Sequence, residues 1–140
     1  MGVVLNKEWV DPMEISRQQI EAVNALPAGK RYDHFIKRIV DQEEVWSLYD
    51  GGWAVSSTTS GAQSLPVWPA REYAELCKAP GWSSYQPKSV DLNTFLEEMI
   101  PDLAEKKINI AVSMLPSGEA IIVNGKKVVE DIEEEMQNYL

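Results

Sequence analysis

Apolar residues recur every three or four positions in five parts of the chain, which is the spacing of one helix face. This spacing predicts helices over about 16–26, 28–41, 69–78, 91–103 and 126–140. Pro69 suits the first residue of the third helix, and Pro101 should kink or split the fourth. The last helix is expected to bury Val128, Val129, Ile132, Met136 and Tyr139.

Shorter runs of aromatic and β-branched residues, bounded by turn residues, predict strands. They are expected over 45–49, 53–58, 62–68, 108–115 and 119–123. Asp50-Gly51-Gly52 supplies the positive φ angles of a tight hairpin between the first two, and Pro116-Ser117-Gly118 turns the chain between the last two. Pro66 lacks an N–H, which places the third strand at an edge or a bulge. Residues 82–90 are predicted to form a loop.

The resulting order, α-α-β-β-β-α-α-β-β-α, predicts an α+β fold. A three-stranded meander and a second hairpin make about five mostly antiparallel strands, with helices packed mainly on one face. Residues 1–140 contain no repeat, low-complexity run or linker, which predicts a single domain. Residues 1–14 are expected to form a loosely ordered N-terminal extension.

The charge of the chain narrows the choice of partner. With 22 acidic and 13 basic side chains, the formal charge is −9. Such a surface repels phosphate backbones and anionic lipid, so neither nucleic acid nor a membrane is an expected partner. A basic protein partner is compatible with the charge, although solubility alone also explains it. The single cysteine, Cys77, indicates a reducing, cytoplasmic location.

One predicted helix carries a basic stripe opposite its apolar face. The stripe consists of Lys30, Arg31, His34, Lys37 and Arg38. A solvated helix surface is the simpler interpretation. The functional interpretation is a docking strip for an acidic group.

Familiar catalytic and metal-binding patterns are missing from the sequence. His34 is the only histidine and Cys77 the only cysteine, and they are predicted on different helices. Nucleophilic catalysis needs a base beside its nucleophile, and a zinc cluster needs more such ligands. The sequence therefore predicts no metal site, no cofactor and no catalytic residue. A pair of carboxylates that meet in a cleft stays open as a source of acid–base chemistry.

The aromatic segment from Trp46 to Tyr85 is the strongest candidate for a binding site. It holds four of the five tryptophans, interleaved with proline and glycine. Rings this dense build either a core or the wall of a pocket. Trp46 is expected to be buried. Proline-rich loops lie at the surface by default, so Trp68, Trp82 and Tyr85 are expected to be partly exposed around a shallow groove. The candidate binding residues are Trp53, Trp68, Arg71, Trp82 and Tyr85, with packing alone as the alternative.

Two parts of this segment, 46–50 (Trp-Ser-Leu-Tyr-Asp) and 65–69 (Leu-Pro-Val-Trp-Pro), resemble a family of small bacterial proteins, domain of unknown function 2750. The resemblance continues through 71–77 and 82–87, and it extends from about Arg31 to Ile122. It implies a compact bacterial domain. Because the family has no assigned activity, the resemblance implies no catalytic residues.

Two hypotheses of function arise from these patterns. The first is a non-catalytic acidic interaction module, of the adaptor or toxin-neutralising type, that binds a basic partner. The second is a small-molecule-binding protein or an atypical hydrolase that uses the same aromatic groove, with Asp50, Arg71, Glu75 and Tyr85 as polar members. The protein is expected to be a monomer or a homodimer, which would pair through the Pro66 strand or through the basic stripe.

Overall fold

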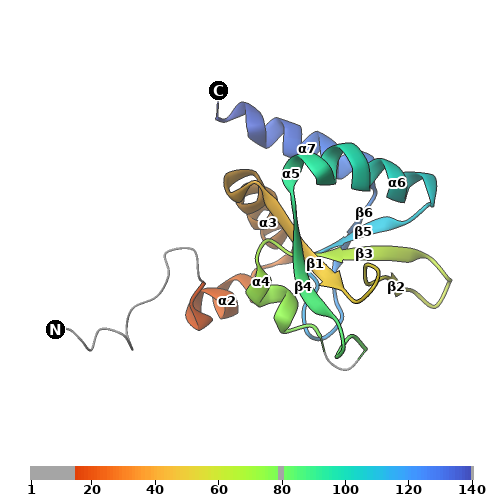
Figure 1. The fold of residues 1–140 in the computed structure, drawn as a ribbon. Helices are drawn as coiled ribbons and strands as arrows, with labels where there is room; N and C mark the ends of the chain where they lie inside the picture. The colour runs from red at the N-terminus through yellow and green to blue at the C-terminus, as the bar shows by residue number, and fades with distance from the viewer. Residues whose placement is uncertain (1–14, 79–80, 140) are drawn as a thin grey trace.

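The computed structural model describes residues 15–78 and 81–139 (Figure 1). The prediction for residues 1–14 lies outside these ranges. The elements in chain order are α2 (Arg17–Asn24), α3 (Ala28–Gln42), β1 (Glu44–Tyr49), β2 (Ser56–Ser57), β3 (Gln63–Val67), α4 (Arg71–Glu75), β4 (Gln86–Asp91), α5 (Leu92–Thr94), the π-helical turn η1 (Phe95–Met99), α6 (Ile100–Glu105), β5 (Asn109–Val112), β6 (Ile121–Val123) and α7 (Gly125–Gln137). The predicted α+β class is confirmed.

The strands form a two-stranded sheet, β1-β4, and a four-stranded sheet, β2-β3-β5-β6. The β3–β5 pair is parallel and the other pairs are antiparallel, so the expected mostly antiparallel arrangement is confirmed. Two backbone hydrogen bonds join the sheets where Trp46 meets Trp68. The Trp46 N–H donates to the Trp68 carbonyl at 3.0 Å, and the Trp68 N–H donates to the Trp46 carbonyl at 2.8 Å.

The predicted meander is wrong in its details. The segment 53–58 contributes only the two residues of β2. The predicted loop 82–90 overlaps a strand, β4, which pairs with β1 from Glu44↔Asp91 to Tyr49↔Gln86. The β4 sequence is polar and includes Pro87, as suits an edge strand, because within residues 15–78 and 81–139 β4 pairs with β1 alone. A strand with one partner and little buried surface leaves no strong apolar alternation in the sequence.

Pro66 does not lie on an edge strand. β5 pairs along one side of β3, whereas on the other side β2 pairs at its start and β1 meets it just past its end. Because backbone groups alternate along a strand, Pro66 faces the gap between these two partners, where an N–H would find no strand to donate to. Its carbonyl accepts a hydrogen bond from the Ser47 hydroxyl at 2.6 Å. The missing N–H therefore marks the change of partner.

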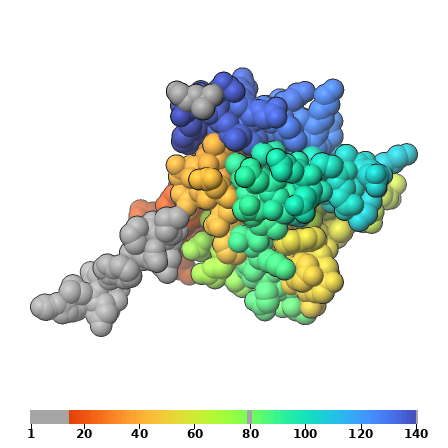
Figure 2. All heavy atoms as spheres, turned by 45° about the horizontal axis from the view of Figure 1, so that its top comes forward, coloured from red at the N-terminus to blue at the C-terminus, as the bar shows by residue number. Residues whose placement is uncertain are grey.

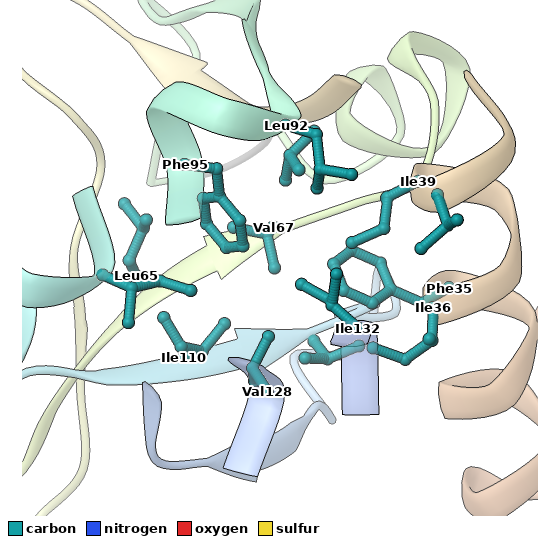
Figure 3. Packing of buried hydrophobic residues seen from close by; sticks show 14 residues of the cluster. Phe35, Ile36, Ile39, Leu65, Val67, Leu92, Phe95, Ile110, Val128 and Ile132 are labelled. Carbon is teal, nitrogen blue, oxygen red and sulfur yellow. The ribbon is translucent and has the colours of Figure 1, made fainter. Parts of the chain in front are cut away.

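Side-chain alternation along β3 divides the core into two clusters. Leu65 and Val67 point into the first cluster, where α3, α5, η1 and α7 pack against the sheet (Figure 3). Trp68 points into the second cluster, which is covered by α2 and α4. The two longest helices, α3 and α7, lie on the first cluster, in keeping with the expectation that helices gather mainly on one face.

The helices near Pro69 and Pro101 differ in detail from the prediction. α4 begins at Arg71 with Ala70 as its cap, so Pro69 stays outside the helix. Before Pro101 the helix widens into η1, and the Ile100 N–H donates to the Phe95 carbonyl five residues earlier. This wider turn accommodates Pro101, which has no backbone N–H to donate and whose ring crowds the carbonyl four positions back. The predicted disruption at Pro101 therefore takes the form of a π-turn.

α7 buries Val128 and Ile132 as predicted, but its last turns leave the core. Met136 is 38% exposed and Tyr139 is 57% exposed, so the expectation that they are buried is wrong. Their spacing continues the apolar face of the helix, but the helix extends past the strands at this end (Figure 1). The apolar period thus continues beyond the surface that it was expected to cover.

Two helical glycines allow a test of the packing between α6 and α7. A Cβ on Gly125 would lie 2.7 Å from Cγ2 of the buried, β-branched Ile100, whereas a Cβ on Gly29 would meet nothing within 4 Å. We expect Gly125→Ala to lower the free energy of unfolding by about 1–3 kcal/mol through overpacking. Gly29→Ala should leave it unchanged or raise it by up to about 1 kcal/mol. Urea unfolding of both variants measures the difference, and equal effects would contradict this packing.

Cys77 allows a chemical test of the second cluster. Burial raises the pKa of its thiol from 9.0 to about 11, against a smaller lowering effect of Trp68, and its Sγ donates to the Met114 carbonyl at 3.2 Å. Two pKa units reduce the thiolate fraction about a hundredfold, so Cys77 should react with a disulfide reagent at least that much more slowly in the folded protein at pH 8.

Unfolding in guanidinium should restore the ordinary reaction rate of Cys77, which is the only cysteine. Because the folded pKa lies above the unfolded one, the thiol favours folding below about pH 9, and this contribution is lost as the pH rises through about 11. Rapid reaction of the native protein at pH 8 would show that the cluster is open.

Candidate binding sites

Trp68 is a core residue. Its side chain is 0% exposed, and its Nε1 donates to the Met114 carbonyl at 2.9 Å. The expectation that it is partly exposed is wrong, because strand alternation turns its ring into the second cluster beneath α4. Trp46, expected to be buried, is only half-buried, and its Nε1 donates to the Glu44 carboxylate at 2.9 Å. A sealed Trp68 cannot contact a ligand.

The other candidate residues of this segment are half-buried or exposed. Trp82 and Tyr85 are half-buried and pack against the second cluster. Arg71 is exposed and forms an ion pair with Glu75 at 3.8 Å, a pair that solvent screens. Asp50 accepts a hydrogen bond from the Ser84 hydroxyl at 2.9 Å. Their binding role remains a prediction.

Trp53 lies apart from these residues and forms one wall of a separate hollow. Its ring meets Tyr49 edge-on at 5.0 Å, and the Lys88 ammonium lies 4.1 Å from the Tyr49 ring centroid and 5.7 Å from that of Trp53. The hollow measures about 490 Å³ and is lined by Trp53, Val55, Leu65, Glu98, Met99, Asp102, Leu103, Lys106 and Ile108. Within it, Lys106 and Asp102 already neutralise one another at 3.0 Å.

The predicted basic stripe is divided between solvent and interior. Lys30 and Lys37 are exposed, whereas Arg31 is 6% exposed and both His34 and Arg38 are half-buried. Arg31 donates from Nε to the Ser113 carbonyl at 3.2 Å and from Nη1 to the Leu26 carbonyl at 3.1 Å. The expectation of a wholly solvated stripe is therefore wrong. The reason is that α2, α4 and the chain at residue 113 cover this side of α3.

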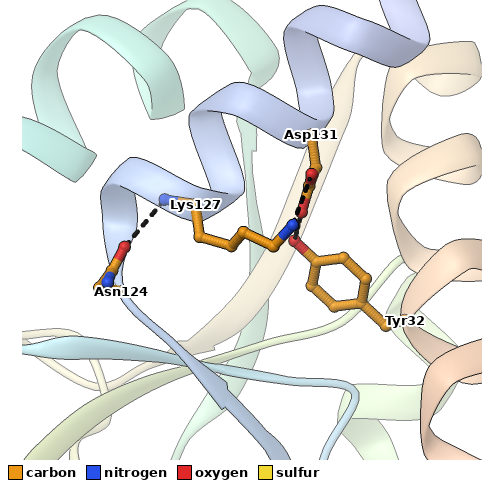
Figure 4. A network of polar contacts seen from close by, with 4 residues as sticks. All are labelled: Tyr32, Asn124, Lys127 and Asp131. Carbon is orange, nitrogen blue, oxygen red and sulfur yellow. Dashed lines mark hydrogen bonds and ion pairs between the residues drawn. The ribbon is translucent and has the colours of Figure 1, made fainter.

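A polar network holds α3 against α7 (Figure 4). The Tyr32 hydroxyl donates to Asp131 at 2.5 Å, and the Lys127 ammonium lies 3.1 Å from the other oxygen of that carboxylate. Burial, followed by the hydrogen bond and charge of Asp131, raises the pKa of Tyr32. The hydroxyl thus remains a proton donor throughout the physiological pH range. Because its members satisfy one another, we assign this network a structural role.

A further hollow, which we call the acidic groove, has no local signature in the sequence. It measures about 610 Å³ and lies where α3 ends, α5 begins and α7 ends, elements that meet on the face seen in Figure 2. It is lined by Val40, Glu43, Asp91, Leu92, Asn93, Glu133, Met136, Gln137 and Tyr139. Its lining thus combines apolar side chains with three carboxylates.

Backbone contacts fix the position of two of these carboxylates. Glu43 ends α3 in a left-handed conformation with φ 58°, and its carbonyl accepts the Leu92 N–H at 2.9 Å. Asp91 caps the following helix by accepting the Thr94 N–H at 3.3 Å. The pairing of β1 with β4 therefore brings together acids that are far apart in sequence. Only the folded chain shows this proximity.

The carboxylates of the acidic groove are outside the ion pairs of the described residues. Within residues 15–78 and 81–139, no ion pair shorter than 4.0 Å involves Glu43, Asp91 or Glu133. In the same ranges, no three His, Cys, Asp or Glu side chains are grouped closely enough to hold a metal ion. The groove can therefore pair with several cationic groups of one ligand. Met136 and Tyr139 add exposed apolar surface beside them.

Comparisons with known proteins identify the family. None of the helices within 15–78 and 81–139 has the length and apolar character needed to cross a bilayer. A search of curated proteins and a search of solved structures gave no match. The family model described as "Protein of unknown function (DUF2750)" matches residues 32–132, in agreement with the resemblance of the aromatic segment, and the chain therefore belongs to this family.

Proposed function

We propose that the protein is a non-catalytic interaction module whose acidic groove binds a basic, partly apolar segment of another protein. The observation that carries this proposal is the combination of three carboxylates outside any described ion pair with exposed Met136 and Tyr139 in one hollow. A formal charge of −9 adds long-range attraction for a basic partner.

The chemistry of the groove favours a polypeptide segment over a single ion. Because its carboxylates do not form a metal-binding group, each can accept a different lysine or arginine side chain of one ligand. Met136 is flexible and polarisable, and Tyr139 offers an aromatic ring, so both can adapt to aliphatic side chains between those cations. Val40 and Leu92 provide an apolar floor.

The alternative function has less support. A small-molecule site or hydrolase built around Trp68, Arg71, Trp82 and Tyr85 would need Trp68 in its wall, and this ring is fully buried. An adaptor or toxin-neutralising protein is the class that a basic-segment site suits best. We infer the bacterial cytoplasm as its setting, which the bacterial resemblance and the single thiol, Cys77, support.

Peptide binding tests this proposal. A fluorescein-labelled peptide of alternating leucine and arginine pairs should bind the protein, and its glutamate-for-arginine counterpart should not. Glu43→Gln/Glu133→Gln should weaken the arginine peptide about tenfold, the combined effect of losing two solvent-screened charge pairs. Fluorescence anisotropy measures both affinities, and the affinity should fall as salt rises.

Glu134→Gln/Glu135→Gln is the matched control. It removes the same number of charges, both of them from α7, at a hollow between α3 and α7 that lies outside the acidic groove. We expect it to change the affinity by less than about threefold, because only long-range attraction is lost. Equal weakening by both double variants would show that net charge alone attracts the peptide, and the groove would lose its assigned role.

A further inference from the structure

We propose that the contact between α3 and α4, at His34, Arg38 and Tyr73, is a binding site for an oxyanion such as a phosphate or carboxylate group. We call these three residues the α3–α4 seam. The proposal does not depend on the function of the acidic groove, which includes Val40 and Glu43 at the C-terminal end of α3 but none of these three residues.

The seam is defined by buried polar atoms that lack partners. Within residues 15–78 and 81–139, the buried side-chain atoms with no hydrogen bond are Nδ1 of His34, Nε of Arg38, the hydroxyl of Tyr73 and Oγ of Ser113. Three of the four belong to the seam. Ser113 follows β5 and lies outside the seam, beside Arg31, whose Nε donates to the Ser113 carbonyl.

The three side chains come together through the packing of α4 on α3. His34 and Arg38 are four residues apart, so they lie on the same side of the helix. The His34 and Tyr73 rings meet edge to face, with their centroids 6.3 Å apart. Tyr73 is only 3% exposed, whereas His34 and Arg38 are half-buried, which leaves the seam a route to solvent.

The three atoms of the seam that lack partners can all act as hydrogen-bond donors, and none of them has an acceptor. The Nε–H of arginine can only donate, a tyrosine hydroxyl donates readily, and Nδ1 donates in the imidazolium and in one neutral tautomer. A buried donor on a charged group is costly when it is unpaired. An oxyanion can accept from all three side chains and also balances the positive charge of Arg38. These atoms therefore match the chemistry of a phosphate or carboxylate group.

The local charge favours an anion in spite of the acidity of the whole molecule. Burial and then the charge of Arg38 lower the pKa of His34, while burial raises the pKa of Tyr73 to about 12 against the opposing charge of Arg38. Arg38 thus acts on both rings, and Arg31 adds a second cation one turn beyond His34. Glu72 acts on Tyr73 in the opposite sense to Arg38, and its carboxylate accepts the Ile15 N–H at 3.5 Å.

NMR of the imidazole ring tests the site, because His34 is the only histidine in the chain. Inorganic phosphate and acetate are titrated separately at constant ionic strength, with chloride as the balancing anion. We expect a saturable shift of the His34 ring resonances, and a rise in the pKa of His34 when the site is filled. The stronger of the two titrations identifies the phosphate or the carboxylate as the preferred group.

Three variants separate a built site from general charge. Arg38→Gln should weaken anion binding about tenfold or more, and Tyr73→Phe, which removes only the hydroxyl, should weaken it about threefold or more. Lys37→Gln removes an exposed charge from the same helix, and should change the affinity by less than about twofold. Thermal unfolding checks that each variant is folded. If Arg38→Gln does not fold, the anion affinity of Tyr73→Phe alone tests the proposal.

Three results would overturn the proposal. The first is a shift that does not saturate or that chloride reproduces, since this indicates screening. The second is equal weakening by Lys37→Gln and Arg38→Gln. The third is unchanged anion affinity in Tyr73→Phe, which would mean that ordered water satisfies the hydroxyl.

Discussion

The paired hydrogen bonds between Trp46 and Trp68 are the constraint on which the arrangement of this protein depends. They join two sheets that otherwise share no ladder. The junction is possible because Pro66 ends the pairing of β3 with β2 and leaves the next positions to β1, while Ser47 satisfies the proline carbonyl. With β1 held there, Trp68 is directed into the second cluster and Val67 into the first.

The same junction places the acidic groove. Once β1 is fixed against β3, β4 can pair only along its other side, and Glu44 then lies opposite Asp91. This register brings the end of α3 to the start of α5, where the Glu43 carbonyl accepts the Leu92 N–H. α7 extends past the strands and completes the hollow with Met136 and Tyr139. The groove is therefore a consequence of how three element ends meet.

α3 connects the two proposed sites and separates their charges. Its apolar face packs on the first cluster, one flank meets α4 with His34 and Arg38, and its C-terminal end contributes Glu43 to the groove. An acidic molecule thereby keeps a small basic region partly shielded by protein, where its field is less screened than at an exposed surface. The helix thus contributes to the proposed anion site and to the proposed binding groove for a basic segment at different positions.

Local patterns in the sequence predicted much of the fold. The apolar period of α3 and the core part of α7, the turn at Gly118 and the disturbance at Pro101 depend on neighbours within a few residues, and the structure contains all of them. The α+β class follows from their order. The family resemblance likewise depended on contiguous motifs, and the match over residues 32–132 confirms it.

Only the tertiary structure decided which side chains are exposed and which of them meet. Trp68 lies beside prolines in the sequence, yet strand alternation and α4 enclose it completely. β4 has the composition of a loop, because an edge strand needs little apolar surface. Glu43, Asp91 and Glu133 come from three separate segments, and no spacing along the chain relates them. Sequence periodicity specifies a face of an element, but what covers that face is set by the packing of distant segments.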